Sequence, residues 1–290
     1  MTRRAVNALR SRVASACGYL ALLCALPAAI AAEQELERTG GPFVPTPQIV
    51  VDNMLQFANV GAKDYVIDLG SGNGVIVLTA ASKLNASGHG VDIDPELVRL
   101  SNAEAKRLGV AERASFRVED IFKADLSRAT VITLYLLPSM MVNLRPKIFN
   151  EAKPGTRVVS HDYTFAEWQP DDQIVLEVPE KEKVNGVPRA TISLWIVPAQ
   201  VHGRWQLQVE GGERYDLNLQ QNFQSVRASA SVAGRDAKFT YVSLKGTDIA
   251  LTIVEGGARR AFTGKVVGNS MQGTVQLDAA RTVRWSARKT

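Results

Sequence analysis

Glycine recurs at every second position of the segment Asp68–Gly74, Asp-Leu-Gly-Ser-Gly-Asn-Gly, which directly follows the apolar run Tyr65–Ile67. Residues without a β-carbon allow the chain to turn sharply after a strand and let a ligand lie against the backbone, with the next helix start facing the ligand's carboxylate. The dinucleotide pattern G-x-G-x-x-G is not met, because its third glycine, counted from Gly70, falls on Val75. Nicotinamide and flavin cofactors therefore lose support. The acid at Asp68 suits a ligand with cationic groups; a glycine turn that binds nothing is the alternative.

Acidic residues also close two later apolar segments. A short apolar strand ends in Asp92, 24 residues after Asp68, and the alternating segment Ala114–Val118 is followed directly by Glu119 and Asp120. Any single acid could be a helix cap. Acids at the ends of three successive strands are not explained by capping alone, and they favour a shared ligand site.

The pattern up to about residue 200 alternates short apolar strands with amphipathic helices. Strands are expected at 65–69, 89–93, 115–119, 130–136, 156–161, 173–178 and 190–197, and helices at 48–58, 75–84, 96–108 and 139–152. Such alternation predicts an α/β fold with a doubly wound parallel sheet, which a hairpin of the last two strands completes. Ligands of these sheets bind at the carboxyl ends of the strands, where each acid described above lies.

After Pro198 the helical period disappears, and apolar and polar residues alternate, as in Val226–Val232 and Ile249–Ile253. A tight Gly268-Asn269 turn joins two of these segments. We therefore expect a small antiparallel all-β domain, a barrel or a sandwich, without a catalytic constellation. The predicted division is a leader at 1–31, an α/β domain at 32–200 and the β domain at 201–290.

The glycine loop and the acids at successive strand ends resemble those of class I S-adenosylmethionine-dependent methyltransferases, whose fold is a seven-stranded Rossmann-like sheet. The resemblance implies S-adenosylmethionine as cofactor, with Asp68 near its amino group and sulfonium. Asp92 would accept hydrogen bonds from both ribose hydroxyls; Asp94 is the competing candidate, but it is better placed to cap a helix. Asp120 would contact the adenine amino group. The implied cofactor-binding residues are Asp68, Gly70, Ser71, Gly72, Gly74, Asp92, Ile93, Glu119 and Asp120.

The fourth strand ends in the segment Leu134–Pro138. Amino-directed methyltransferases often carry Asn/Asp-Pro-Pro-aromatic at this place, and its absence argues against adenine or glutamine methylation. Tyr135 and Pro138 are the catalytic candidates by position, although packing in the core explains Tyr135 equally well. His161, in Ser160–Tyr163, has no partner spacing typical of a metal site or a catalytic triad, so no metal is expected.

Four motifs narrow the resemblance. They are Pro42-Phe43-Val44-Pro45, Asp68 to Val77, Leu137-Pro138-Ser139-Met140-Met141 leading into Leu144–Lys147, and Trp168-Gln169-Pro170-Asp171. Together they are similar to small membrane-associated lysine methyltransferases that modify the c-ring protein of mitochondrial ATP synthase and the adenine nucleotide translocator. The similarity runs from about residue 42 to 172, roughly half of the chain. It implies a protein substrate, membrane-embedded ones included, and a segment Phe43–Thr46 that closes over the cofactor.

The expected reaction is direct displacement at the sulfonium methyl by a neutral lysine amine, held about 3 Å away and in line with the breaking bond. An apolar mouth favours the neutral amine by lowering its pKa, and aromatic rings attract the ammonium. The residues expected at this mouth are Tyr135, Tyr163, Phe165 and Trp168, with core packing as the alternative. Two other functions stay open: methylation of a small molecule or lipid, and a catalytically silent exported protein that binds a partner through its β domain.

The net charge of +5 and the pI near 9.2 come mostly from the N-terminus, where Arg3, Arg4, Arg10 and Arg12 stand without acids. Removing these four from the 34 basic side chains leaves 30 against 29 acidic ones. The rest of the chain therefore indicates no nucleic-acid-binding surface. Nothing in the sequence sets the oligomeric state.

The leader has a basic start, an uncharged run from Val13 to Ala32 and an Ala29-Ile30-Ala31 cleavage pattern. We expect a secretory signal or an anchor, which places the protein in the periplasm or facing it, with a mitochondrial presequence as the alternative. Both cysteines, Cys17 and Cys24, lie in this leader, so the mature chain needs no disulfide. Arg3-Arg4 partly resembles a twin-arginine signal, which carries folded proteins with their cofactors.

Overall fold

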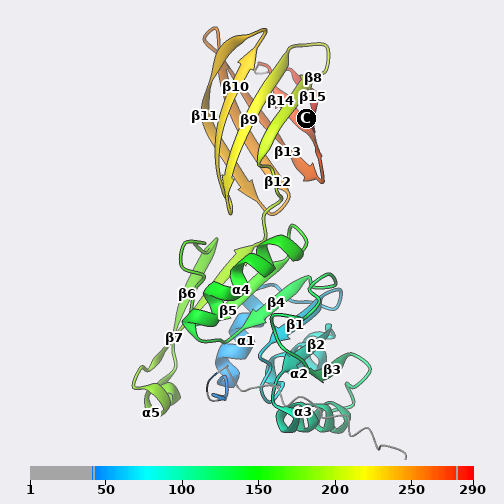
Figure 1. Ribbon diagram of the computed structural model, residues 1–290, viewed down its shortest axis with the longest axis vertical. Coiled ribbons are helices and arrows are strands. Elements are labelled where there is room, and N and C mark those ends of the chain that lie inside the picture. Colours follow the sequence, from blue (N-terminus) through cyan, green and yellow to red (C-terminus); the bar gives the residue numbers. More distant parts are fainter. Residues whose placement is uncertain (1–40, 42, 279) are drawn as a thin grey trace, which may run out of the picture. The chain divides into compact units, whose positions relative to one another are not determined.

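The computed structural model describes residues 41, 43–278 and 280–290, so the predicted leader and Pro42 lie outside the described residues. Seven strands form one sheet in the order β3-β2-β1-β4-β5-β7-β6 (Figure 1). Their bounds are β1 (Tyr65–Leu69), β2 (Ser87–Asp92), β3 (Ala114–Val118), β4 (Val131–Leu134), β5 (Arg157–His161), β6 (Asp172–Glu177) and β7 (Arg189–Ile196). The first five are parallel, and β6 and β7 form an antiparallel hairpin. The predicted α/β sheet with its completing hairpin is confirmed.

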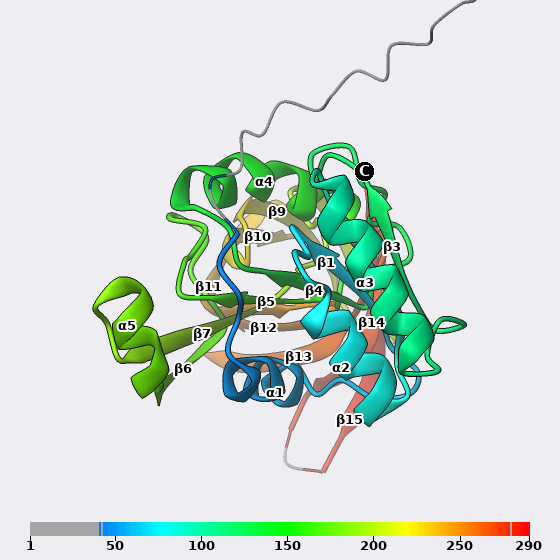
Figure 2. The same ribbon diagram turned by 90° about the horizontal axis from the view of Figure 1, so that it is seen from below.

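Helices cover both faces of this sheet. The bounds are α1 (Gln48–Phe57), α2 (Val75–Leu84), α3 (Pro95–Arg107) and α4 (Pro138–Glu151), with η1 (Pro179–Lys181) and α5 (Glu182–Asn185) between β6 and β7 in the chain. Strand residues Val66, Val131 and Val159 pack with α1, α2 and α3, whereas Ile67, Ile132 and Val158 pack with α4 on the opposite face (Figure 2). Burial on both faces explains why the strands read as continuous apolar runs. None of the described helices is long and apolar enough to span a membrane.

Two helices begin where the sequence supplies the local geometry. The Asp94 side chain accepts hydrogen bonds from the backbone N–H groups of Glu96 (2.9 Å) and Leu97 (3.4 Å), and Pro95 is the first residue of α3. Asp94 is therefore the cap of this helix. Helix α2 begins directly after Gly74, whose φ of 76° is a left-handed conformation that glycine adopts without steric cost.

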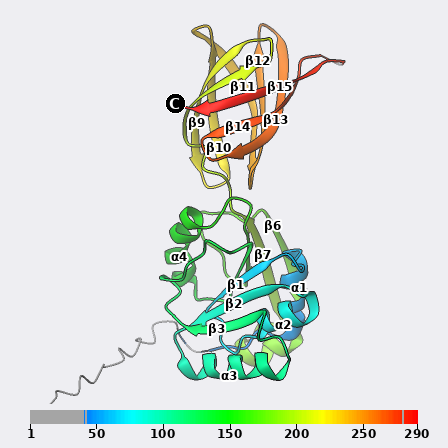
Figure 3. The same cartoon turned by 90° about the vertical axis from the view of Figure 1, so that its right-hand side faces the viewer.

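Residues after the sheet form a closed antiparallel barrel (Figure 3). Its strands are β8 (Gly203–Val209), β9 (Arg214–Asn222), β10 (Ser225–Val232), β11 (Arg235–Lys245), β12 (Asp248–Glu255), β13 (Ala258–Val267), β14 (Ser270–Gln276) and β15 (Thr282–Lys289). Each pairs with the next, and β15 pairs with β8 to close the barrel. Trp205, Tyr215, Phe262 and Trp285 fill its interior. Val267 pairs with Ser270 across the predicted Gly268-Asn269 turn. Of the two predicted all-β forms, the barrel is the one that occurs.

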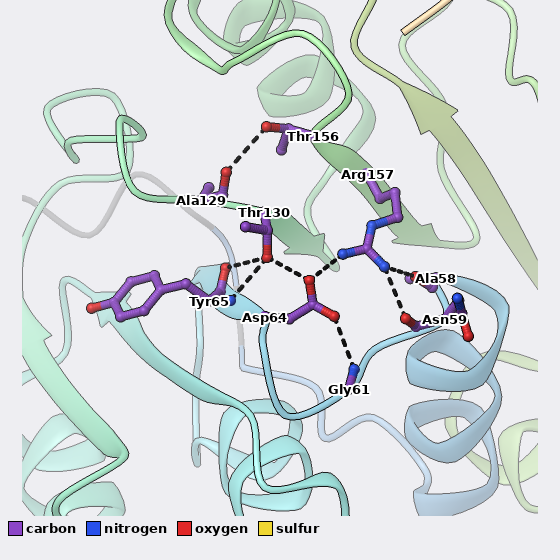
Figure 4. Close-up of polar contacts among 9 residues, drawn as sticks. All are labelled: Ala58, Asn59, Gly61, Asp64, Tyr65, Ala129, Thr130, Thr156 and Arg157. Carbon is purple, nitrogen blue, oxygen red and sulfur yellow. Dashed lines mark hydrogen bonds and ion pairs between the residues drawn. The ribbon is translucent and has the colours of Figure 1, made fainter. Parts of the chain in front are cut away.

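A polar network holds the amino ends of three central strands together (Figure 4). The Asp64 carboxylate accepts hydrogen bonds from Thr130 Oγ1 (2.7 Å) and Gly61 N–H (2.9 Å), and it forms an ion pair with Arg157. The Arg157 guanidinium also donates to the carbonyl oxygens of Ala58–Asn59 at the end of α1 (2.7 and 2.8 Å). This network therefore fixes α1 and the starts of β1, β4 and β5, and leaves the opposite, carboxyl ends free for a ligand.

Candidate active site

A cavity of about 290 Å³ lies at the carboxyl ends of the parallel strands. Of the predicted site residues, Asp68, Gly70, Ser71, Asp92, Ile93, Asp120 and Tyr135 line it, whereas Gly72, Gly74, Glu119 and Pro138 are not among its lining residues. Phe43, Val44 and Thr46 also line it, so the segment predicted to close over the cofactor lies beside the cavity. The structure therefore brings the ends of three acid-bearing strands to one place.

The glycine loop after β1 exposes backbone to the cavity. Gly70, Gly72 and Gly74 have φ values of 80°, 52° and 76°, a region that residues with a β-carbon rarely adopt. The N–H groups of Gly70 and Ser71 both donate to the carbonyl oxygen of Val91 (2.9 Å each), which ties the loop to β2. The buried Ser71 hydroxyl has no hydrogen-bond partner among the described residues. A buried polar atom of this kind is available to a ligand.

Asp68 closes β1 with a carboxyl group that is only 2% exposed. Thr133 Oγ1, on the neighbouring strand β4, donates to its Oδ1 at 2.6 Å. Burial raises the pKa of Asp68 to about 7; the nearby charge of Asp92 adds to this rise, and the hydrogen bond from Thr133 opposes it. A cationic ligand group beside this carboxyl would stabilise its charged form.

Asp92 connects the loops that follow β1 and β2. Its Oδ2 accepts a hydrogen bond from Gly72 N–H (2.8 Å) and its Oδ1 from Asp94 N–H (3.0 Å), so the carboxylate is fixed at the cavity wall. Asp120, after β3, accepts a backbone hydrogen bond from two residues further along (2.9 Å) and lines the same cavity. The Glu119 N–H donates to the carbonyl oxygen of Asp92 (3.0 Å), so Glu119 joins the two strand ends through its backbone.

Tyrosines take the place of acids after β4 and β5. Tyr135 lies just beyond β4, because that strand ends at Leu134 and not at residue 136 as predicted. Tyr135 and Tyr163 both line the cavity, with ring planes 14° apart and centroids separated by 6.4 Å. Burial raises the pKa of Tyr135 to about 12, and the nearby charge of Asp162 adds to the rise, so its phenol stays protonated. Pro138 is the first residue of α4.

Phe165 and Trp168 do not form part of an aromatic mouth. Both are fully buried, and both pack against Trp195 of β7. The Phe165 and Trp195 ring centroids lie 4.8 Å apart, and Trp195 Nε1 donates to the carbonyl oxygen of Trp168 (2.8 Å). The prediction that these two side chains lie at the mouth is wrong, because their large apolar rings stabilise the core beneath α4.

Thr133 was not predicted from the sequence. It is the one polar residue in β4, Val131-Ile132-Thr133-Leu134, and in the parallel register it stands opposite Asp68. A hydroxyl inside an otherwise apolar buried strand is the signal that could have revealed it, because buried polar groups need partners. In the described part of the chain, no group of three or more His, Cys, Asp or Glu side chains could hold a metal ion.

The profile of the family described as the ANTKMT methyltransferase domain matches residues 68–172. A protein-lysine N-methyltransferase of Saccharolobus islandicus is 44% identical over 157 residues, which are 54% of this chain and 93% of that protein. The chain belongs to the S-adenosylmethionine-dependent protein-lysine methyltransferase family. The resemblance predicted from its motifs is confirmed.

Two further similarities place this methyltransferase among its relatives. A human lysine N-methyltransferase that is named for the c-ring protein of ATP synthase is 32% identical over 130 residues, so the chain spans 55% of the length of that protein. A crystal structure described as an RNA methyltransferase from Salinibacter ruber, in complex with S-adenosyl-L-homocysteine, is 46% identical. It covers 55% of this chain and 96% of its own, with a TM-score of 0.50.

S-adenosylmethionine, the cofactor of this methyltransferase, fits the residues of the cavity. The glycine loop leaves backbone uncovered, the Ser71 hydroxyl lacks a partner among the described residues, and three carboxyl groups face one space. Asp68 has the buried negative charge that a cationic amino group or sulfonium needs. The predicted contacts of Asp92 with the ribose and of Asp120 with adenine can be tested residue by residue.

Replacing Asp92 by Ala is expected to weaken S-adenosylmethionine binding about 100-fold, because two charge-assisted hydrogen bonds of about 1.5 kcal/mol each would be lost. Isothermal titration calorimetry measures the dissociation constant. Asp94→Ser is the matched control: it preserves a helix cap and should change the constant less than about threefold. Equal losses in both variants, or unchanged binding by Asp92→Ala, would contradict the ribose contact.

Proposed function

We propose that this methyltransferase transfers a methyl group from S-adenosylmethionine to the side-chain amine of a lysine in a protein substrate. The observation that supports it most is the sequence of side chains along the carboxyl edge of the sheet. Acids Asp120, Asp92 and Asp68 follow or close β3, β2 and β1, and tyrosines Tyr135 and Tyr163 follow β4 and β5. Because these strands are neighbours in this order, the cavity has a charged end and an aromatic end.

The charged end is proposed to hold the cofactor. Asp120 accepts from the adenine amino group, Asp92 from the ribose hydroxyls, and Asp68 faces the amino group and sulfonium. The glycine loop, with Gly70 and Ser71, lies along the cofactor and provides backbone and hydroxyl contacts. When bound, S-adenosylmethionine supplies an activated methyl group, so the protein needs to bind, orient and exclude water and needs little acid–base chemistry.

The aromatic end is proposed to receive the lysine. Tyr135 and Tyr163 attract the ammonium through their ring faces, and Leu137 and Met140 make the same end apolar. Loss of hydration in such a place lowers the pKa of the amine and favours the neutral nucleophile. The amine then displaces the sulfonium methyl directly, from about 3 Å and in line with the breaking bond.

The substrate is proposed to be a protein with an apolar surface, membrane proteins included. Three side chains at the cavity are apolar or aromatic and yet exposed: Phe43 at 45%, Leu137 at 42% and Tyr163 at 36%. The human relative is named for the c-ring protein of ATP synthase, which supports this substrate class. We also propose that the protein acts in the periplasm or facing it; the basic, apolar leader with its Ala-x-Ala pattern supports export.

The function is tested by tritiated-methyl transfer from S-adenosylmethionine into periplasmic and membrane extracts. The wild type should label protein, and acid hydrolysis should recover the label as methyl-lysine. The Asp68→Ala/Asp92→Ala double variant should not label, because the cofactor would not bind. Label found only in lipid, in a small molecule or in RNA would contradict a lysine acceptor, and label absent from wild type and variant alike would favour a silent binding protein.

Tyr135→Ala is expected to lower kcat on a methylated protein about 10-fold to 100-fold with little change in cofactor affinity, since it removes a ring from the acceptor end. Tyr135→Phe, which keeps the ring, should retain most of the activity. Tyr241→Ala removes a 54% exposed tyrosine on β11 and serves as the matched control. Steady-state kinetics and calorimetry give the two quantities. Full turnover by Tyr135→Ala would contradict a role in holding the amine.

A further inference from the structure

Three polar side chains form a buried cluster behind the aromatic end of the cavity. His161 ends β5, Asp162 follows it, and Lys181 lies in η1, about twenty residues along the chain. His161 is 1% exposed and Lys181 4% exposed. Lysine is almost never this deeply buried unless its charge is paired, so the arrangement has a specific cause.

All three ammonium protons of Lys181 have acceptors. Its Nζ donates to Asp162 Oδ2 (2.5 Å) and to the carbonyl oxygen of Arg189 (2.8 Å), and it lies 3.2 Å from His161 Nε2. An ammonium group has only donors, so Nε2 of His161 must be the acceptor and carries no proton. The imidazole proton is therefore on Nδ1.

The backbone around the cluster is fixed as tightly as its side chains. Asp162 has a φ of 65°, a left-handed conformation that costs free energy in a residue other than glycine. Its N–H donates to the carbonyl oxygen of Thr191 (2.7 Å), and its Oδ1 accepts from Thr191 N–H (3.1 Å). These bonds to β7 hold Asp162 where it meets both Lys181 and His161.

The cluster keeps His161 neutral. Burial lowers the pKa of His161 to about 4; the Asp162 carboxylate opposes this effect, and the Lys181 ammonium adds to it. The titratable groups around the ring are thus Asp162, Lys181 and the phenol of Tyr135, whose own pKa is raised. His161 Nδ1 is buried and has no hydrogen-bond partner among the described residues, so it contributes no bond that would hold the fold together.

The neutral ring lies directly against the proposed acceptor end. The His161 and Tyr135 rings stack with centroids 4.0 Å apart and planes 28° apart. Beyond Tyr135 lies Tyr163, nearly parallel to it. An imidazolium at this place would occupy a ring face of Tyr135 by cation–π attraction and would repel a second cation a few ångströms away.

We propose that His161 is a positioning residue for methyl transfer, which Lys181 fixes as the neutral Nδ1–H tautomer so that it supports the Tyr135 ring without placing a positive charge beside the incoming lysine ammonium. The role at the acceptor end rests on the proposed function. The tautomer and the neutrality of His161 rest on the cluster alone. Lys181 acts through His161 and need not touch the substrate.

Nitrogen-15 NMR of histidine-labelled protein tests the cluster independently of activity. The chain has three histidines, so His161→Gln assigns the signal by its loss. In the wild type, His161 should show the Nδ1–H tautomer and no titration between pH 6 and 8. Lys181→Met should raise its pKa into the measurable range, since the repelling cation is gone while Asp162 stays. Lys181→Arg keeps the cation and should keep His161 neutral. Lys183→Met, at an exposed lysine two residues on, is the matched control.

An Nε2–H tautomer in the wild type, or a titrating wild-type His161, would overturn the proposal even if Lys181→Met failed to fold. The kinetic test compares kcat/KM for a protein substrate at saturating cofactor. The ratio of Lys181→Met to wild type should fall about tenfold per pH unit below the His161 pKa found by NMR, through a higher KM. A ratio independent of pH while His161 titrates would overturn the positioning role. If wild type methylates no lysine, the proposed function fails while the NMR result still decides the state of His161.

Discussion

The buried carboxyl group of Asp68 is the constraint on which the site depends. It lies at the carboxyl end of the central strand β1, where water is excluded, and burial keeps its pKa near 7 in spite of the hydrogen bond from Thr133. A charge in such a place is unfavourable unless a cation meets it. The glycine loop that follows leaves the space for that cation, because no β-carbon fills it. Asp68 and the loop are therefore one device, in which neither part serves without the other.

The topology of the sheet extends this device into a graded cavity. Parallel strands place their carboxyl ends along one edge, so the order β3-β2-β1-β4-β5 becomes an order of side chains, from three acids to two tyrosines. The polar network at Asp64 and Arg157 holds the opposite ends of the central strands. The fold thus separates a structural end, where charges are paired within the protein, from a ligand end, where they are not.

The sequence predicts those parts of the structure that are encoded locally. The alternation of strands and helices, the glycine loop, the Asp94 cap and the Gly268-Asn269 turn each depend on a few neighbouring residues, and all of them occur in the structure. Partners that are distant in sequence were not predictable. Thr133 meets Asp68 across 65 positions and Lys181 meets His161 across 20, and no local spacing connects them. Phe165 and Trp168 show the same limit, since only the three-dimensional packing decides whether an aromatic ring lines a mouth or fills a core.

The central claim is that the buried Asp68 carboxylate is the counter-charge of the bound cofactor. It is tested most directly by the number of protons released when S-adenosylmethionine binds, which calorimetry in buffers of different ionisation enthalpy measures. Because the folded pKa is about 7, Asp68 is mostly protonated at pH 6, and binding of a cation should release about 0.9 of a proton there. At pH 8.5 the release should approach zero, and in Asp68→Asn it should be absent at both values. Proton release that is the same at pH 6 and pH 8.5, or unchanged in Asp68→Asn, would contradict the claim.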